Sequence, residues 1–428
     1  MRTAERHVIS MTDPLGDPVD AGDDLGIEAP AWLFVLSWDL KHAGGVNEVV
    51  KNVFDRTARR LRHRPLLLVR KWEQKTPVMT VQDGRTTIAA RIRGPWPSAQ
   101  RPLINLALYV LGLPWVVGRL IRMARAQRVT VINVHYPDLH ALTWLLVRRF
   151  SRRPIRVILS FHGLDLKSAL AASGLERLCW KVLLRRSDLI IVCAQALLDR
   201  LVAGFPGCAQ HVHVVANGVD IRSLELATQR PPAMELPKSY VMSIGTYERK
   251  KGHDVLMEAF DRVAARNPSV ALVVAGRYSE AEYTRLMQLR EQLASKERIL
   301  LLKDLAHGEA MRVLAGAELF ALASRDEPFG IAILEAAALS RPIVATSVCG
   351  AAKLFCAGRD LLVVPPDDVG ALSAAMERLL NDRTAATELA RSLRPQVVAS
   401  FDWDSITDAY LRLLGVAAPS AKALRALD

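Results

Sequence analysis

The chain has 428 residues, of which 50% are hydrophobic, 24% are charged and 6% are aromatic. Such a composition buries a large apolar core in water, so it excludes disorder for the bulk of the chain, and the length favours two domains. The 24 glycines and five cysteines exclude collagen-like and disulfide-scaffold proteins. No two cysteines have C-x-x-C spacing, and we interpret them as reduced thiols rather than bridges or metal ligands.

The net charge of +13 is distributed unevenly along the chain. Residues 1–30 contain 2 basic and 7 acidic side chains, residues 31–220 contain 29 and 11, and residues 221–428 contain 26 of each. The first 30 residues have no apolar run of the kind found in signal peptides, and we expect a disordered acidic tail there. The basic first half indicates an anionic partner, for which nucleic acid, anionic lipid and a phosphorylated ligand are the alternatives.

Short β-branched segments alternate with helical patterns in the first half of the chain. This pattern predicts a parallel sheet flanked by helices, in a Rossmann-like N-terminal domain over residues 31–222. The predicted strands are 32–38, 66–70, 129–135, 156–162, 188–194 and 211–218, and a helix is predicted over 46–61.

A second series of the same kind follows residues 223–239, whose sequence QRPPAMELPKS predicts a linker. It forms a second Rossmann-like domain over 240–400. We expect the helix within 401–416 to pack back toward the N-terminal domain, and residues 417–428 to be a tail. The fold class is therefore α/β, with two doubly wound parallel-sheet domains facing each other across a cleft. The predicted strands are 239–245, 270–276, 298–304, 318–324, 341–346 and 360–365, and a helix is predicted over 253–266.

Residues 103–118 (LINLALYVLGLPWVVG) contain no charge, and four arginines follow within the next ten residues. The segment is short for a membrane span, which needs about 20 residues, and Gly and Pro interrupt it. A buried helix packed on the first sheet is the simpler interpretation. The adjacent arginines, Tyr109 and Trp115 leave binding at a membrane interface open.

The most specific motif is EPFGIAILE, from Glu327 to Glu335, which follows a predicted strand. Pro328 and Gly330 predict a loop before the helix that carries Glu335. The backbone N–H groups of Phe329, Gly330 and Ile331 would then be free helix-start donors for the oxygens of a sugar or phosphate. Two carboxylates eight residues apart would face the same strand-end site. Glu327 as a helix cap and Glu335 as a solvated acid is the simpler alternative.

This motif resembles the donor-binding stretch of the retaining glycosyltransferases of family 4, which have the GT-B fold, and the resemblance covers roughly residues 31–415. It implies that Glu335 holds the ribose hydroxyls of a sugar nucleotide. It also implies that Glu327 and the amides of Phe329, Gly330 and Ile331 hold the donor sugar. The stretch EAAALSRPIVAT continues the resemblance.

A basic turn, GTYERKKG, follows the first strand of the second half. Three consecutive cations, Arg249, Lys250 and Lys251, can neutralise a diphosphate, although a solvated turn explains them as well. The resemblance implies that Lys251 binds the pyrophosphate. The arginine that the family has directly after Gly245 is Thr246 here, and Arg249 or Lys250 would substitute for it.

Several first-half residues lie at predicted strand ends. Gly44, Gly45 and Val46 form a loop between strand and helix, without the spacing of a dinucleotide fingerprint. The family has such a loop near the donor phosphates and the acceptor, and it has a histidine in the position of His162 that contacts the donor sugar. His135 has a similar but weaker position.

Asn217 precedes a glycine at the end of the last first-half strand. We place it only near the interdomain cleft, since Asn-Gly is a common turn. Asp402 and Asp404 have the acid–any–acid spacing of a metal site. They precede a helix, however, so capping by Asp404 is the preferred interpretation and no metal ligands are predicted.

Other positions depart from the family pattern. Ser340 replaces a usual glycine after the donor helix, Lys303 and Asp304 stand where a strand-end glycine is usual, and Lys353 stands where glutamate is common.

The resemblance implies a retaining, metal-independent transferase that moves a hexose from a nucleotide diphosphate sugar and uses no cofactor beyond that donor. The basic first half favours a glycan or polyprenyl-diphosphate-linked acceptor, as in exopolysaccharide assembly. We expect a cytoplasmic protein, with peripheral association at the inner face of the membrane left open and no nucleic acid partner. A soluble transferase making a small glycoside and a catalytically silent sugar-nucleotide-binding subunit are the alternatives.

Overall fold

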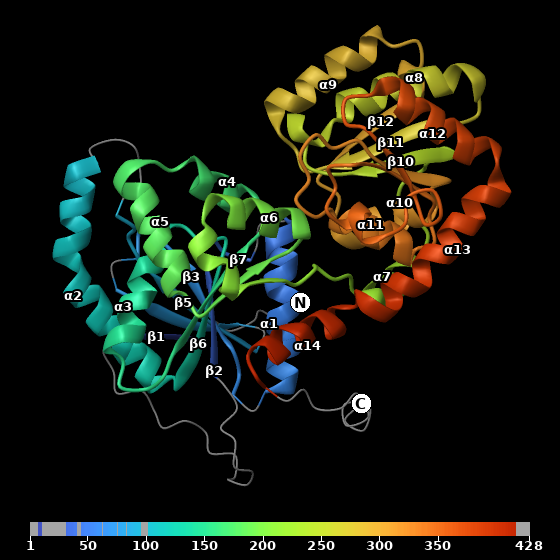
Figure 1. Ribbon diagram of the computed structural model, residues 1–428. Coiled ribbons are helices and arrows are strands. Elements are labelled where there is room, and N and C mark those ends of the chain that lie inside the picture. Colours follow the sequence, from blue (N-terminus) through green and yellow to red (C-terminus); the bar gives the residue numbers. More distant parts are fainter. Residues whose placement is uncertain are drawn as a thin grey trace. The chain divides into compact units, whose positions relative to one another are not determined.

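The computed structural model describes residues 7–10, 31–40, 44–61, 63–74, 76–82, 84–95 and 102–416. The chain forms two compact units (Figure 1). The first unit comprises Met1–Val215 and Thr407–Asp428, and the second comprises Ala216–Ile406. Of the predicted tails, most of 1–30 and all of 417–428 lie outside the described residues.

The first unit is built on a nine-stranded sheet with the order β1-β4-β5-β3-β2-β6-β7-β8-β9. All neighbouring pairs are parallel except β1 with β4 and β4 with β5. All six residues of β2 are buried, as expected for a parallel strand that is covered on both faces. The strands are β1 (His7–Ser10), β2 (Ala31–Leu36), β3 (Leu66–Arg70), β4 (Val78–Gln82), β5 (Arg85–Ala90), β6 (Val129–His135), β7 (Arg156–Phe161), β8 (Leu189–Val192) and β9 (Val212–Val214).

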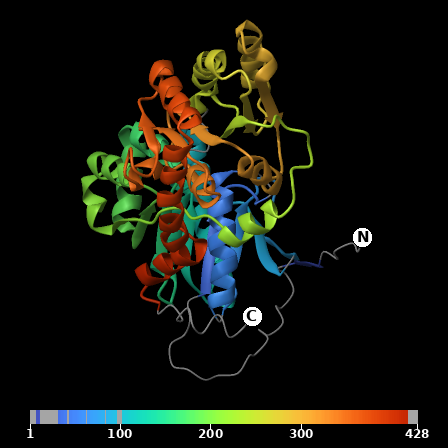
Figure 2. The same cartoon turned by 90° about the vertical axis from the view of Figure 1, so that its right-hand side faces the viewer.

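Helices cover both faces of this sheet, with α2, α3 and α5 on one face and α1 and α14 on the other (Figure 1). Helix α14 lies beside α1 in both views (Figure 2), where Arg60 and Asp408 form an ion pair of 2.8 Å. The helices and 3-10 turns are α1 (Gly45–Arg60), α2 (Pro102–Ala126), η1 (Leu139–Ala141), α3 (Leu142–Phe150), α4 (Leu164–Ala171), α5 (Gly174–Arg186), α6 (Gln195–Gly204), η2 (Pro206–His211) and α14 (Trp403–Leu413).

Three strands of this sheet were not predicted. Strands β4 and β5 form an antiparallel hairpin around Gly84, which has a φ of 72°. Their Thr, Gln and Arg residues break the apolar pattern used for the other strands. Within the segment expected to be a disordered tail, His7–Ser10 forms β1, which pairs with β4. For these four residues the structure differs from the expectation, because backbone pairing with an edge strand needs no apolar run.

The second unit contains a six-stranded, entirely parallel sheet with the order β12-β11-β10-β13-β14-β15. Numbered from its first strand, this is the order 3-2-1-4-5-6 of the doubly wound dinucleotide-binding fold. Helix α8 packs on α12, and α11 packs on α13. The strands are β10 (Tyr240–Ile244), β11 (Ala271–Gly276), β12 (Ile299–Lys303), β13 (Leu319–Leu322), β14 (Ile343–Thr346) and β15 (Leu362–Val364). The helices and 3-10 turns are α7 (Ile221–Thr228), η3 (Arg249–Lys251), α8 (His253–Arg266), α9 (Glu280–Gln292), η4 (Lys296–Arg298), α10 (His307–Ala315), α11 (Ile331–Ala338), η5 (Ala351–Leu354), α12 (Val369–Asn381) and α13 (Arg383–Ser400).

The predicted linker 223–239 needs correction, because it begins inside helix α7. Asp220 caps this helix by accepting a hydrogen bond from the backbone N–H of Ser223, and α7 packs on α10 of the same unit. Capping by Asp404 is also wrong. Asp402 is the cap of α14, since its carboxylate accepts a 2.8 Å hydrogen bond from the N–H of Asp404.

The uncharged segment belongs to one continuous helix, α2, with Pro114 inside it. Among the described residues, it is the one helix long and apolar enough to cross a membrane by length and composition, with a mean hydropathy of 1.7. Only 17% of that apolar stretch is buried. The interpretation as a buried core helix is therefore wrong for most of its length.

Candidate donor site

The candidate site of the second unit lies at the point where the strand order reverses. Strands β10 and β13 are neighbours there, although 74 residues separate the end of β10 at Ile244 from the start of β13 at Leu319. In doubly wound sheets, ligands bind outside the carboxyl ends of the strands at this reversal. The loop after β10 carries the basic turn, and the loop after β13 carries Glu327. Both predicted donor-binding motifs thus meet at one edge of the sheet.

Lys251 and Glu327 form an ion pair across this reversal. The Lys251 Nζ lies 2.5 Å from Oε2 of Glu327, and the two side chains are 16% and 10% exposed. Burial favours the neutral amine, but the neighbouring carboxylate outweighs it, so the pKa of Lys251 is raised above its ordinary value. Lys251 is therefore a fixed cation in a largely buried site, where a charge interacts more strongly with a ligand than it does in bulk water.

Two local features hold the basic turn in place. Gly252 has a φ of 64°, and a Cβ on it would lie 2.0 Å from the carbonyl oxygen of Ala323. Only glycine therefore lets the turn approach the end of β13 this closely. Tyr247 is fully buried, and its hydroxyl lies 3.0 and 2.8 Å from the carbonyl oxygens of Val274 and Leu302. Burial raises the pKa of Tyr247, so the hydroxyl remains a hydrogen-bond donor.

Arg325 ties the two loops together, and the sequence analysis did not identify it. Its guanidinium donates to the carbonyl oxygen of Arg249 and to both carboxylate oxygens of Asp254. The backbone N–H of Arg325 donates to the carbonyl oxygen of Lys250 at 2.7 Å. In the sequence, Arg325 stands out only because it lies two residues before Glu327, and that position alone does not indicate a structural role.

Helix α11 begins at Ile331, four residues after Glu327 of the ion pair. Gly330 precedes the helix with a φ of 91°, and Phe329 is 3% exposed, so it anchors the loop. Within the described residues, the N–H groups of Phe329, Gly330 and Ile331 donate to no backbone carbonyl. The loop is fixed through its carbonyl groups instead, because Glu327 and Phe329 accept hydrogen bonds from Gly350 and Ala351. These amides remain available to an anion or a sugar oxygen, as the motif predicted.

Glu335 lies one turn into the same helix and is largely buried. Its Oε1 lies 2.7 Å from Nε2 of His307, at the start of α10. Glu335 is 8% exposed, whereas the side chain of His307 is 52% exposed. The interpretation of Glu335 as a solvated acid is therefore wrong. His307 is a further side chain at this site that the sequence analysis missed.

The other predicted cations behave differently from Lys251. Lys250 is turned toward Glu248, with 2.7 Å between the charged atoms. Arg249 is exposed, and no carboxylate among the described residues forms an ion pair with it. Gly245 directly follows β10, and a Cβ on it would lie 3.4 Å from the Lys251 side chain. Of the two candidates for the role of the missing arginine at Thr246, Arg249 is thus the one that is not already paired.

In the sheet of the first unit, the strand order reverses between β2 and β6. Gly44 and Gly45 are exposed at the start of α1, and Val46 is half-buried in its first turn. His135 ends β6 and His162 follows β7, the next strand of the sheet. The structure therefore brings these two histidines together, with Nδ1 of His135 3.2 Å from Nε2 of His162.

Both histidines are uncharged at neutral pH. Burial lowers the pKa of His162 to about 4, and burial together with the neighbouring His162 holds the pKa of His135 well below its ordinary value. Asp165 accepts hydrogen bonds from the backbone N–H groups of His162 and Gly163, which fixes the loop. Burial raises the pKa of Asp165 to about 6, although these hydrogen bonds act to lower it. His162 is thus a neutral hydrogen-bonding group rather than a cation.

Asn217 is 8% exposed and belongs to the second unit. The following Gly218 is required for packing, because a Cβ there would lie 2.8 Å from the Trp403 ring. Lys353 is exposed in η5. Among the described residues, no three His, Cys, Asp or Glu side chains are grouped as metal ligands.

Two family profiles match the chain. "Glycosyl transferases group 1" matches residues 228–396, and "Glycosyltransferase Family 4" matches residues 43–223. The chain therefore belongs to the family-4 type of glycosyltransferases. Among solved structures, it is similar to Anabaena HepE in complex with UDP, with a TM-score of 0.70 and 19% identity over 90% of this chain and 99% of that chain. This likeness confirms the predicted GT-B fold.

Curated relatives agree with the family. The chain is 32% identical to a glycogen synthase of Mycobacterium tuberculosis over 232 residues. This match covers 53% of this chain and 54% of the relative. The match thus spans about half the length of that relative. A D-inositol 3-phosphate glycosyltransferase of Corynebacterium jeikeium is 25% identical over 397 residues, which is 87% of this chain and 91% of the relative.

Proposed function

We propose that the protein transfers a hexose from a nucleotide diphosphate sugar to an acceptor hydroxyl. The observation that carries this proposal is the Lys251–Glu327 pair at the strand reversal, directly before the open start of α11. A bound donor would place its diphosphate on Lys251, with Arg249 as the second cation. Its sugar hydroxyls would then reach Glu327 and the amides of residues 329–331. Glu335 would accept hydrogen bonds from the ribose hydroxyls.

The proposed reaction retains the configuration of the anomeric carbon. The bond between that carbon and the diphosphate oxygen breaks, and the acceptor oxygen bonds on the same face of the sugar. The acceptor proton passes to the leaving phosphate oxygen. Lys251 stabilises the negative charge that develops on the diphosphate, which is preorganised electrostatic catalysis. We propose that protein cations perform this task without a metal ion and that the donor is the one small molecule required.

The proposed acceptor is a lipid-linked or polysaccharide-precursor glycan. The excess of 29 basic over 11 acidic side chains in residues 31–220 supports an acceptor that carries phosphate. We propose that the protein works in the cytoplasm at the inner face of the membrane, where an anionic lipid surface adds to this attraction.

A small phosphorylated sugar or cyclitol is the second candidate acceptor. It is favoured by the similarity to the D-inositol 3-phosphate glycosyltransferase of C. jeikeium, which extends over 87% of this chain. Such an acceptor would use the same basic charge without a lipid.

Transfer of radiolabelled sugar tests both candidates. The purified protein is incubated with a panel of sugar nucleotides and either a bacterial lipid extract or a set of sugar and cyclitol phosphates. Label in the organic phase supports the lipid-linked acceptor, and label in a water-soluble phosphorylated product supports the second candidate. The anomeric coupling constant of the product reports retention or inversion. Donor binding without turnover on any acceptor would overturn the proposal in favour of a silent subunit.

A further inference from the structure

Helix α2 presents an apolar stripe to solvent, and the proposed sugar transfer does not use it. Leu103 is 80% exposed, Leu111 is 78% exposed and Trp115 is 61% exposed. Ile104, Leu108, Leu111 and Trp115 follow one another at spacings of three or four residues, so they lie on one side of the helix. An exposed apolar surface of this extent indicates a binding partner that is itself apolar.

The same side of the helix becomes basic toward its C-terminal end. Arg122 and Arg125 are exposed and continue the stripe. Between them and the apolar part, the guanidinium of Arg119 lies 3.7 Å from the centroid of the Trp115 ring. The whole sequence from Gly84 to Pro137 contains eight arginines and no acidic residue. Tryptophan and arginine at the border between apolar and basic surface are typical of segments at a membrane interface.

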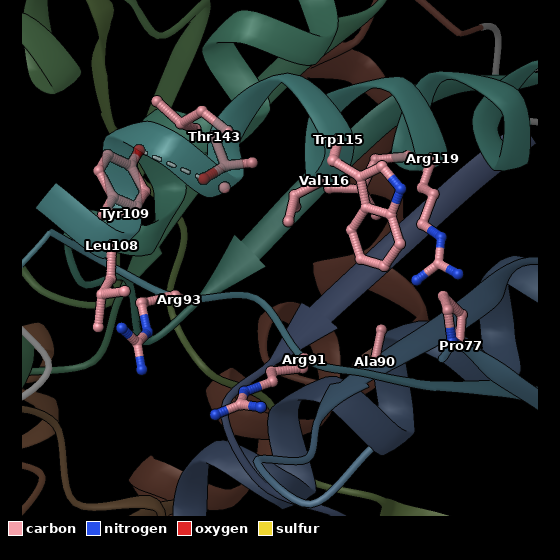
Figure 3. A pocket seen from close by; sticks show the side chains of 13 residues that line it. Pro77, Ala90, Arg91, Arg93, Leu108, Tyr109, Trp115, Val116, Arg119 and Thr143 are labelled. Atoms are coloured by element: carbon pink, nitrogen blue, oxygen red, sulfur yellow. Dashed lines mark hydrogen bonds between the residues drawn. The ribbon is translucent and has the colours of Figure 1, made fainter. Parts of the chain in front are cut away.

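A cavity of about 340 Å³ lies between α2 and the end of β5 (Figure 3). Leu108, Trp115 and Val116 form its wall on the helix, and Arg91 and Arg93 follow β5 on the opposite side. The guanidinium groups of both arginines lie near the ring of Trp72, at 4.7 and 5.2 Å. No described carboxylate forms an ion pair with either of them. The cavity thus combines apolar walls with cations, which suits a hydrocarbon chain that bears an anionic head.

The topology excludes a helix that crosses the bilayer. The two ends of α2 join β5 and β6, which belong to one sheet. The other side of the helix packs on this unit, where Val117, Leu120 and Met123 are buried and the Tyr109 hydroxyl lies 3.4 Å from that of Thr143. A crossing would separate α2 from this sheet and place polar strands in lipid. The helix is therefore fixed parallel to the surface of its unit.

We propose that α2 lies in the plane of an anionic bilayer surface and that the adjoining cavity receives the hydrocarbon chain of one anionic phospholipid. The apolar stripe enters the acyl region, and Arg122 and Arg125 contact the headgroups. Arg91 and Arg93 hold the phosphate of the bound lipid. This proposal goes beyond the sugar transfer and does not depend on it, because its test measures binding alone.

Vesicle co-sedimentation of the full chain tests the surface. We expect binding to phosphatidylcholine vesicles that contain phosphatidylglycerol, weak binding to phosphatidylcholine alone, and release in high salt. Each cation near such a surface contributes about fivefold, so Arg122→Gln with Arg125→Gln should weaken binding about 25-fold. The double variant Arg222→Gln with Arg230→Gln removes equal charge from the second unit and should weaken it much less.

The apolar part is tested with Leu111→Ser and Trp115→Ser together. We expect at least a tenfold loss of binding, whereas Leu226→Ser, at an exposed apolar position of α7, should retain it. Each variant is compared with the wild type by thermal unfolding to establish that it is folded. Equal binding to neutral vesicles, wild-type binding by the α2 variants, or resistance to both high salt and alkaline carbonate would overturn the in-plane proposal.

Native mass spectrometry tests the cavity. The chain should retain one phosphatidylglycerol and no phosphatidylcholine after detergent exchange. Gly112→Leu should abolish this retention, because Gly112 lines the cavity and a Cβ there meets open space. Gly118→Leu is the matched control, since it lies on the same helix, outside the cavity lining, with equally open space. Retention by Gly112→Leu, or loss in both variants, would overturn the lipid site. A prenyl phosphate that displaces the phospholipid would overturn its assignment to a bilayer lipid.

Discussion

Lys251 and Glu327 are 76 positions apart in the sequence, yet their charged atoms are 2.5 Å apart in a largely buried ion pair. Each side chain balances the charge of the other. A diphosphate and a sugar hydroxyl would replace these mutual contacts with contacts to the donor. The ion pair therefore keeps both side chains positioned at the reversal of strand order, and it has to separate when the donor binds.

Replacing Lys251 by alanine should lower kcat by about 100-fold or more, because charge on the leaving diphosphate grows in the transition state. Lys250→Ala serves as the control, since Lys250 is paired with Glu248. Steady-state kinetics with saturating acceptor measure both variants. A Lys251→Ala enzyme with wild-type kcat would contradict the proposed role, and Arg249 would then be the cation to examine.

Replacing Glu335 by glutamine should raise the donor KM most and leave kcat nearly unchanged. The ribose contact is made in the ground state and in the transition state alike, so its loss weakens uniform binding. The variant keeps the shape of the side chain, and Nε2 of His307 can still donate to its amide oxygen. Donor titrations at fixed acceptor report KM and kcat separately. A fall in kcat with unchanged KM would show that Glu335 acts in the chemical step instead.

Ser340 has a φ of 56°, which is the left-handed region that glycine adopts without strain. Ser340→Gly removes about 1–2 kcal/mol of strain and adds roughly 0.5 kcal/mol of entropy to the unfolded chain, so it should stabilise the second unit by a net amount of about 1 kcal/mol. Differential scanning calorimetry measures this as a rise of roughly 2–4 °C in the melting temperature. Ser347→Gly, at a position without a positive φ, is the comparison and should not stabilise. An unchanged or lower melting temperature for Ser340→Gly would refute the strain.

His253 should make the stability of the second unit depend on pH between about 4 and 6.5. Burial, followed by the nearby Lys251, lowers the pKa of His253 to about 4. The unfolded chain therefore binds a proton below about 6.5 that the folded chain does not, and stability falls as the pH falls through this window.

The loss from this group between pH 7 and pH 5 is about 2 kcal/mol. His253→Gln should show a correspondingly smaller decrease in unfolding temperature over that range. Thermal unfolding of both proteins at several pH values measures the difference. Parallel pH profiles would show that His253 titrates normally in the folded state.

The sequence predicted the two parallel sheets because their strands are short segments rich in apolar and β-branched residues, such as Leu66–Arg70 and Val129–His135, which agree with β3 and β6. The hairpin of β4 and β5 was missed since Thr, Gln and Arg interrupt the apolar residues of its strands. The interpretation of 103–118 also failed in part, because composition alone does not show which side of a helix is covered.

The candidate site was predictable where a short motif fixes local geometry. Gly330 and the start of α11 follow directly from the order of residues 327–335. Arg325 and His307 were missed because their partners, Asp254 and Glu335, are distant in sequence and become neighbours only through the strand order. The structure also explains two departures from the family pattern. Ser340 and Asp304, which stand where glycines are usual, both have positive φ, at 56° and 49°.

Helix α14 has a consequence for biosynthesis. Its last turns complete the first unit, where Tyr410 and Leu411 are buried, Tyr410 packs on Trp32, and Arg156 donates to the carbonyl oxygen of Leu414. A ribosome adds these residues only after it has synthesised the whole second unit. The surface around Trp32 therefore stays uncovered until the end of the chain has left the ribosome. A nascent chain stalled before residue 407 would expose that surface to chaperones, although every strand of both sheets had already been synthesised.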